Sequence, residues 1–480
     1  MKSARLSQFH AFLRRAKKPA TLLATALALG SAATVQAIPV IPGSEGYGME
    51  TKAGRGGKVY KVTNVNASGS GSLKACIDAS GPRTCVFEVS GVIKFTSDLI
   101  IRNSQLRIAG QTAPSPGIMI RGAGIRITTS DVLIQHIRVR TGDDSNGPDP
   151  DNRDSLLIGG TESKPARNVV IDHCSFSWSI DELVSAWGPH DNITFTNNIF
   201  AEPLHDSLHP DYDGVGRMPH GYGVLFGQYP NSSITFTGNL LAHIVERNPL
   251  SRASQFVMVN NLIYDRQTRD IDLQSEGGVV TKNSIVGNYF LRGPSVDRDT
   301  KPIFVHTTGT YRLGSGSRVY VHDNRAPDTG STYDALVALI GGDKIANLMT
   351  QSSAPVWHTG LSPIKTANSA VYSHVLEHAG ARPNDRDVVD KRIVLQVRKR
   401  TGGIINCVGS NGTTRCKKNG GGWPKLAVNK RTLTLPSNHA SIASNGYSNL
   451  ENWLNSMDRS ISNAVAADSS PTAPPSLSVN

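Results

Sequence analysis

Two arginines five residues apart stand in the segment Glu246-Arg247-Asn248-Pro249-Leu250-Ser251-Arg252, between two strand-like stretches. At the end of a strand, both side chains can point at one anionic ligand. The planar guanidinium group matches a carboxylate through two parallel hydrogen bonds. The segment therefore predicts a site for a polyanion, and the groups beside it decide whether that polyanion is also cleaved.

Acids and histidines occur where a repeating chain would bring them beside these arginines. Asp154 precedes an apolar strand, and Asp181 and Glu182 follow that strand. A long insertion after Phe200 contains His205, His209, Arg217 and His220. Three of these, His205, Arg217 and His220, are candidates for contacts with a substrate. Carboxylates in a cleft suit calcium, which takes oxygen ligands in irregular geometry. Zinc is disfavoured because the histidines lack a regular ligand spacing. The alternative for any single acid–arginine pair is an ion pair without chemistry.

The elements that must position these residues repeat along the chain. Each unit has a short strand rich in Val, Ile and Thr, a polar turn that usually contains Asn, and a second apolar pair. Clear units are 131–139, 168–176, 192–200, 233–241 and 255–263. A fixed minimum period with variable insertions is typical of a solenoid. Strands without intervening helical patterns favour a parallel β-helix, with a β-sandwich as the structural alternative.

The repeats divide the chain into four parts. Residues 38–335 are predicted to form the β-helix, with a short helix at 72–78 that caps its first coil. Residues 336–463 are predicted to be a partly helical extension that packs on the outside, with helices near 368–378 and within 382–400. The stretch 464–480 is rich in Ser, Pro and Ala and is predicted to be a flexible tail. We expect the protein to be a monomer.

Residues 1–37 have the pattern of a secretory signal. A cationic start with no acid precedes an apolar run at 21–29, and Val35-Gln36-Ala37 provides small residues for cleavage. We expect a secreted or periplasmic protein, cleaved near Ala37, without a membrane span. Five cysteines fit such a compartment. Cys76 with Cys85, and Cys407 with Cys416, are close enough to pair, and Cys174 is predicted to be a packed core thiol.

The charge is modestly basic and does not indicate nucleic acid. The formal charge of the chain is +12, and six of its basic residues precede position 19. The repeats carry no basic stripe with interleaved aromatic residues, which single-stranded nucleic acid would require. An anionic polymer of another kind is the expected partner.

Several of these motifs, taken in order, resemble the signatures of family 1 pectate lyases. They are Ile171-Asp172-His173, Ser177-Trp178-Ser179-Ile180-Asp181-Glu182 and Arg247-x-Pro249-x-x-Arg252. Four further stretches, at 42–48, 110–114, 220–223 and 379–387, are similar to a bacterial branch of that family. The resemblance covers most of the chain after residue 37, and its specificity comes from the order and spacing of the motifs.

The resemblance implies a right-handed parallel β-helix that cleaves 1,4-linked galacturonan by β-elimination with calcium. By motif, Arg247 matches the proton-abstracting arginine and Arg252 a substrate-binding arginine. Asp154 and Asp181 match calcium-binding aspartates. Asp172 and His173 fall in a motif with a structural role.

Two positions depart from the family pattern. The family has a second acid four residues after the one that matches Asp181, where this chain has Ser185, so either the metal affinity is weaker or Glu182 compensates. The family also grips the substrate carboxylate with a lysine after the strand at 192–200. This chain has His205 in that region, and Arg217 or His220 are the other candidates for that role.

The elimination makes physical sense at these residues. The C5 proton of a uronate becomes acidic when its carboxylate charge is neutralised, which calcium and Arg252 would achieve. An arginine base needs a pKa lowered by neighbouring positive charge, so activity should rise toward alkaline pH. Three alternatives stay open: a hydrolase built on paired acids such as Asp143-Asp144, a lyase for alginate or glucuronan, and a non-catalytic carbohydrate-binding β-helix.

Overall fold

The structure is a computed structural model that describes residues 38–211, 216–296, 300–341, 348–349, 352–365 and 370–462. The signal peptide predicted at 1–37 and the tail predicted at 464–480 lie outside these residues. Among the described residues, no helix combines the length and the apolar character that crossing a bilayer requires.

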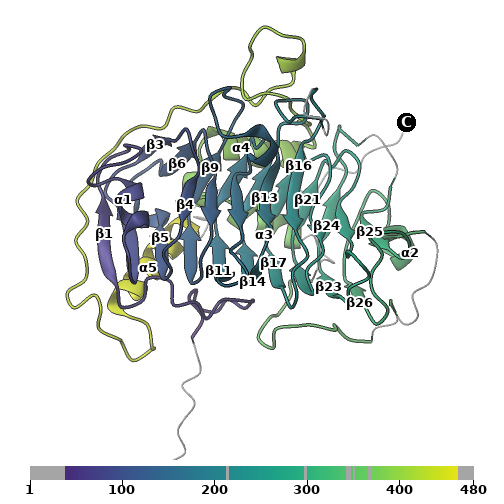
Figure 1. Cartoon of the computed structure of the whole chain (residues 1–480), viewed down its shortest axis with the longest axis horizontal. Coiled ribbons are helices and arrows are strands. Elements are labelled where there is room, and N and C mark those ends of the chain that lie inside the picture. The colour runs from purple at the N-terminus through teal and green to yellow at the C-terminus, as the bar shows by residue number, and fades with distance from the viewer. Residues whose placement is uncertain are drawn as a thin grey trace, which may run out of the picture. The chain divides into compact units, whose positions relative to one another are not determined.

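The strands of the described chain form three parallel sheets, and successive strands along the chain enter the three sheets in turn (Figure 1). The ten-stranded sheet contains β1 (Lys58–Val62), β2 (Arg83–Phe87), β5 (Leu106–Ala109), β8 (Val132–Gln135), β11 (Ala166–Asp172), β14 (His190–Thr196), β17 (Ser233–Thr237), β20 (Gln255–Val259), β23 (Lys282–Val286) and β26 (Arg318–His322). The eight-stranded sheet contains β3 (Gly91–Lys94), β6 (Ile118–Arg121), β9 (Ile137–Arg140), β12 (Ser175–Ser177), β15 (Ile199–Ala201), β18 (Leu240–Ala242), β21 (Leu262–Tyr264) and β24 (Tyr289–Leu291). The nine-stranded sheet contains β4 (Leu99–Ile101), β7 (Ile125–Ile127), β10 (Leu156–Ile158), β13 (Glu182–Ala186), β16 (Tyr222–Phe226), β19 (Leu250–Ser251), β22 (Ile271–Leu273), β25 (Ile303–His306) and β27 (Val337–Ile340).

These sheets confirm the parallel β-helix, and their inward side chains form its core. Ile193, Ile234 and Phe256 pair in register on three successive coils, and all three are fully buried. Because identical positions on successive coils meet directly, the β-branched and aromatic repeats of the sequence become continuous apolar rows. The last strand, β27, pairs with β25, so the stack extends past the boundary predicted at residue 335.

A ladder of asparagines connects the coils at the turn between the ten-stranded and eight-stranded sheets. Asn198 donates its backbone N–H to the side-chain oxygen of Asn239 over 2.8 Å, and Asn239 does the same to Asn261 over 2.9 Å. The ladder continues through Asn288 to Asn324. Each side chain thereby satisfies a buried backbone donor of the preceding coil, which explains why the repeats carry Asn at this position.

The first coil is capped as predicted. Helix α1 (Leu73–Asp78) begins after Ser72, whose side chain accepts a hydrogen bond from the N–H of Ala75. A disulfide joins Cys76 of this helix to Cys85 of β2. The second predicted disulfide, Cys407–Cys416, is also present, and Cys174 is a buried free thiol.

Two helices of the extension cover the eight-stranded sheet, as predicted. They are α3 (Ala370–His378) and α4 (Val388–Lys399), whose apolar side chains form one buried cluster with strands β15, β18, β21 and β24. A buried ion-pair group fixes the start of α4: Arg140 on β9 binds Asp387 over 2.6 Å and Asp390 over 2.8 Å. The short elements that remain are α2 (Tyr333–Leu336), η1 (Gly110–Thr112), η2 (Pro150–Asn152), η3 (Pro383–Asp385) and η4 (Arg415–Lys417).

The last helix returns to the first coils. Helix α5 (Asn449–Ser462), shown in yellow in Figure 1, packs Leu450 and Leu454 against Val86 and Ala109. Arg55 also forms an ion pair with Glu451 over 2.9 Å. Residues nearly 400 positions apart in the sequence therefore lie side by side.

Candidate active site

A cleft of about 270 Å³ lies over the nine-stranded sheet and contains most of the predicted reactive groups. Polar side chains from four loops meet apolar ones from strands β10 and β16 at its floor. Its reactive lining consists of Asp151, Asp154, Asp181, Glu182, His209, His220 and Arg247. Arg247, Asp154 and Asp181 therefore share one cleft, as the sequence predicted.

Three carboxylates converge because they come from the ends of neighbouring coils. Oxygens of Asp154, Asp181 and Glu182 all lie within 4.8 Å of one another. Asp154 accepts a hydrogen bond of 3.0 Å from the backbone N–H of Glu182. Burial, with the charge of Asp181 beside it, raises the pKa of Asp154 well above its ordinary value. Such a set of acids is stabilised by a cation, and its oxygen donors fit a hard one.

Glu182 supplies a carboxylate beside Ser185, the position where the family pattern has an acid. The Ser185 hydroxyl donates to Oε2 of Glu182 over 3.4 Å, and both residues lie on β13. The same carboxylate also forms an ion pair with the guanidinium of Arg247.

Arg247 occupies the turn before β19 with a left-handed backbone, at a φ of +64°. Its guanidinium lies 4.2 Å from the centre of the Tyr222 ring. Burial lowers the pKa of Arg247 to about 10; Arg252 contributes to the decrease, whereas Asp181 and Asp154 oppose it. The cleft thus holds an arginine that loses its proton more easily than one in water.

Two imidazoles from the long insertion lie beside Asp181. The rings of His209 and His220 stack in parallel with centres 3.9 Å apart. The Nε2 atom of His220 lies 3.0 Å from Oδ1 of Asp181, and that of His209 lies 3.7 Å from it. Burial alone would raise the pKa of Asp181, but the contacts with these imidazoles bring it below the ordinary value.

Arg252 directly follows β19, the strand that Arg247 precedes, and does not line the cleft. Its guanidinium donates to the side-chain oxygen of Gln274 over 3.1 and 3.2 Å, pairs with Glu276, and lies 4.8 Å from the Tyr311 ring centre. The backbone N–H of Arg252 binds the carbonyl of Phe226, which extends the ladder of the sheet by one residue. Arg252 is thus close to the cleft but is occupied by neighbours.

The other predicted substrate contacts are divided between two places. His220 lines the cleft, whereas His205 lines a separate polar pocket of about 820 Å³ together with Arg392 and Lys417. His205 reaches the cleft only indirectly, since its Nδ1 hydrogen-bonds the backbone carbonyl of His220. Arg217 is exposed on the insertion loop and is absent from the lining.

The comparisons with known proteins agree on one family. The chain is 30% identical over 455 residues to "Probable pectate lyase C" of Aspergillus fumigatus, covering 92% of this chain and 98% of that protein. The chain belongs to the pectate lyase family. It is also 30% identical over 441 residues to the protein of the same name from Emericella nidulans, covering 88% and 93% of the two chains. No family model matches the sequence.

Among solved structures, a "Pectate lyase bound to hexasaccharide" matches with a TM-score of 0.46 and 15% identity, covering 73% of this chain and all of that one. Both relatives named above are fungal, so the bacterial branch stays a prediction. The family assignment, which rests on the sequence relatives, agrees with the motifs around Asp181 and Arg247.

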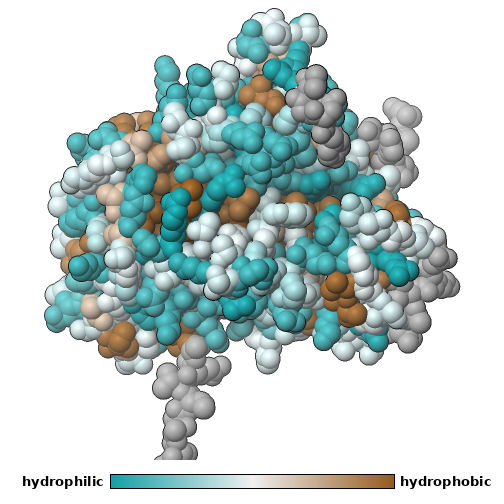
Figure 2. Space-filling model, viewed as in Figure 1, coloured by the Kyte–Doolittle hydropathy of each residue, from teal (hydrophilic) through white to brown (hydrophobic). Residues whose placement is uncertain are grey.

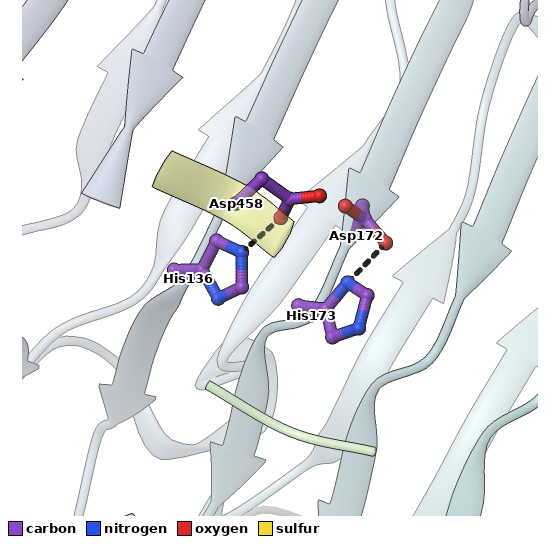
Figure 3. A group of neighbouring side chains, drawn as sticks. All are labelled: His136, Asp172, His173 and Asp458. Carbon is purple, nitrogen blue, oxygen red and sulfur yellow. Dashed lines mark hydrogen bonds and ion pairs between the residues drawn. The ribbon is translucent and has the colours of Figure 1, made fainter. Parts of the chain in front are cut away.

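Asp172 and His173 of the family motif lie away from the cleft. His173 Nδ1 is 2.7 Å from Oδ1 of Asp172, in a buried turn where His136 stacks on His173 (Figure 3). Both histidines have a left-handed backbone at equivalent points of successive coils. The structural role implied for this motif is consistent with that position.

Several lining residues were not assigned to the site from the sequence, among them Asp151, Trp187 and His209. His209 was noted in the insertion without a role, because loop conformation decides which of its histidines turns inward. Trp187 follows strand β13 and is 51% exposed. Its indole lies over Gly227, where a Cβ would stand 2.7 Å from the Trp187 ring. A tryptophan directly after the predicted strand that follows Asp181 is the sequence signal that would have identified it.

Proposed function

We propose that this chain cleaves 1,4-linked polygalacturonate by β-elimination, with Arg247 as the base and calcium held by Asp154, Asp181 and Glu182. The observation that carries the proposal is the meeting of Arg247 with three carboxylates in one cleft. The relatives' names support pectate as the substrate. Calcium, when bound, would draw charge from the uronate carboxylate and so acidify the C5 proton.

The ion pair with Glu182 determines whether Arg247 can accept a proton. An arginine paired with a carboxylate is stabilised in its charged form and is a poor proton acceptor. Glu182 cannot serve fully as a ligand of a cation and as the counter-ion of Arg247 at once. When Glu182 turns toward the other two carboxylates, Arg247 loses its partner and can take the C5 proton.

Arg252 would bind a carboxylate of the sugar chain beside the cleft. Its present partner Glu276 is about half exposed, so exchanging that carboxylate for one of the substrate costs little. Gln274, which is buried, would keep the guanidinium oriented during the exchange.

The structure weakens the hydrolase alternative. Asp143 accepts a hydrogen bond from the backbone of Val408, and Asp144 forms an ion pair with Lys94. Neither acid lines the cleft, so this pair does not flank a bond that Arg247 could reach.

We also propose that the protein is exported. The disulfides Cys76–Cys85 and Cys407–Cys416 support an oxidising compartment, in line with the signal pattern of the first 37 residues.

The direct test is incubation of the purified protein with polygalacturonate, alginate and glucuronan, with and without a calcium chelator. We expect new near-ultraviolet absorbance from an unsaturated product with polygalacturonate alone, and loss of that signal with the chelator. New reducing ends without this absorbance would indicate a hydrolase. Binding without cleavage would indicate a carbohydrate-binding module.

The exposed indole of Trp187 should support a sugar ring next to the reacting one. We expect Trp187→Ala to raise KM for polygalacturonate by about 3- to 10-fold with little change in kcat, since a ring contact of this kind is worth about 0.5–1.5 kcal/mol. Trp187→Phe, which keeps an aromatic face, serves as the control. An unchanged KM in Trp187→Ala would remove the indole from substrate binding.

A further inference from the structure

Three groups of side chains in the described part of the chain bring imidazole or carboxylate donors within reach of one ion. One is the carboxylate set Asp154, Asp181 and Glu182. The other two contain histidine: one is the buried group of Figure 3, and the other adjoins the carboxylate set through Asp181. The proton positions on their imidazoles distinguish these two groups.

In the buried group of Figure 3, both ring nitrogens of His136 make hydrogen bonds. His136 Nδ1 accepts the backbone N–H of Arg382 over 3.2 Å, so the ring proton must be on Nε2. That Nε2–H donates to Asp458 over 2.6 Å, which ties helix α5 to the coil (Figure 3). A metal-binding imidazole instead needs a free lone pair on the ligating nitrogen. His136 therefore has its proton on the nitrogen that faces Asp458, where a metal shared with that carboxylate would have to bind.

His209 has the opposite arrangement. Its Nδ1 lies 2.8 Å from the carbonyl oxygen of Pro210, which can only accept, so Nδ1 carries the proton. In the neutral ring, Nε2 then presents its lone pair to the cleft. A ring N–H bound to a backbone carbonyl is the arrangement that orients metal-ligating histidines.

The oxygens that face this lone pair stand at metal-bridging distances. Nε2 of His209 lies 3.7 Å from Oδ1 of Asp181 and 3.7 Å from Oδ1 of Asp151. This separation is too long for a hydrogen bond. Two ligands on one ion, at bonds of about 2.0–2.2 Å, stand roughly 3–3.7 Å apart. An ion between these atoms would be bound by the lone pair of the ring and by the carboxylate oxygens together.

His220 completes the donor set. It is 5% exposed, and neither of its ring nitrogens makes a well-aligned hydrogen bond within the described residues, although Nε2 is 3.0 Å from Oδ1 of Asp181. Its ring is parallel to that of His209. A buried imidazole in this position gains a partner when an ion occupies the space in front of it.

We propose that Asp181, His209 and His220 form a second cation position in the cleft, suited to borderline first-row divalent ions rather than to calcium. Imidazole nitrogen favours ions such as Co²⁺, Ni²⁺ and Zn²⁺, whereas the all-oxygen set beside it favours calcium. Asp181 belongs to both sets. Like charges on a shared carboxylate repel, so each ion should weaken the binding of the other. The position exists whether or not the chain acts on pectate.

Co²⁺ is the probe, because its visible absorption reports nitrogen ligands without any substrate. Titration of the full chain in calcium-free buffer should give saturable binding of one ion with such a spectrum. We expect His209→Gln and His220→Gln each to weaken Co²⁺ binding at least about tenfold while changing calcium affinity less than about twofold. His322→Gln, which alters an exposed histidine on β26, is the matched control.

The outcomes separate this position from the lyase reaction. Absence of saturable Co²⁺ binding by the unaltered protein, or equal binding by both variants and the control, would overturn the proposal even if polygalacturonate is cleaved. Binding that depends on both histidines would support it even if no polyuronate is cleaved. Calorimetric titration of calcium into Co²⁺-loaded protein should show at least about a threefold weaker affinity than into metal-free protein, from the shared Asp181.

Discussion

Replacing Arg247 by lysine is expected to lower turnover of polygalacturonate by about 10³-fold while polymer binding is retained. The guanidinium reaches over the Tyr222 ring into the cleft, and removal of a positioned proton acceptor costs about 10²–10⁴ in rate. The shorter lysine keeps the charge that pairs with Glu182 but places its single nitrogen elsewhere. The measurement is the initial rate of near-ultraviolet absorbance, with binding followed separately by affinity electrophoresis in the polymer.

Arg269→Lys is the matched control for that substitution. Arg269 lies on the loop before the next strand of the same sheet, is 42% exposed, and pairs with Asp272. It should retain close to full turnover. A similar rate for Arg247→Lys and the unaltered protein would exclude Arg247 as the base.

The same residue sets the expected pH dependence. Burial lowers the pKa of Arg247 to about 10. Below that pH, the neutral fraction of the Arg247 guanidinium increases about tenfold per pH unit, and above it the fraction levels off. Where proton transfer limits the rate, kcat should rise about tenfold per pH unit below it. A flat profile, or one with an acidic optimum, would contradict the assignment.

Replacing Asp390 by asparagine is expected to lower the free energy of unfolding by about 3–5 kcal/mol. Asp390 is fully buried, binds Arg140 over 2.8 Å and accepts from the Ser175 hydroxyl over 2.7 Å. Its loss leaves Arg138 and Arg140 buried with Asp387 as their remaining acidic partner, and an uncompensated buried charge carries a cost of this size. Urea unfolding of the two proteins measures the difference.

Asp385→Asn provides the comparison. Asp385 pairs with Arg382 over 2.9 Å, but its side chain is 30% exposed, so its loss should cost less than about 1 kcal/mol. Equal midpoints for Asp390→Asn and Asp385→Asn would show that the buried group does not secure α4 to the β-helix.

The fold was predictable because its signals are local and repeated. Each coil carries its own strand pattern and its own turn residue. The spacing of Asn239 and Asn261 in the sequence therefore predicts how neighbouring coils align. The two pairs of cysteines, each nine residues apart, are equally local signals. The end of the β-helix was harder to predict, because the short helix α2 directly precedes β27 and interrupts the repeated strand pattern.

The site was predictable only where it is attached to that frame. Asp154, Asp181 and Arg247 sit at the ends of strands, and the stacking of coils brings them together. His205, His209, Arg217 and His220 belong to a long insertion, whose path depends on contacts such as that of His205 N–H with the carbonyl of Ile405. Those contacts join segments 200 residues apart, and no spacing within the insertion reveals which imidazole faces the acids.

The return of α5 to the first coils has a consequence for synthesis. The surface formed by Val86 and Ala109 is covered by Leu450 and Leu454, which are synthesised much later. During synthesis, the first coils therefore stay uncovered until α5 has been made. A nascent or truncated polypeptide that stops before residue 449 would thus be vulnerable to proteases near its beginning, far in sequence from the missing end.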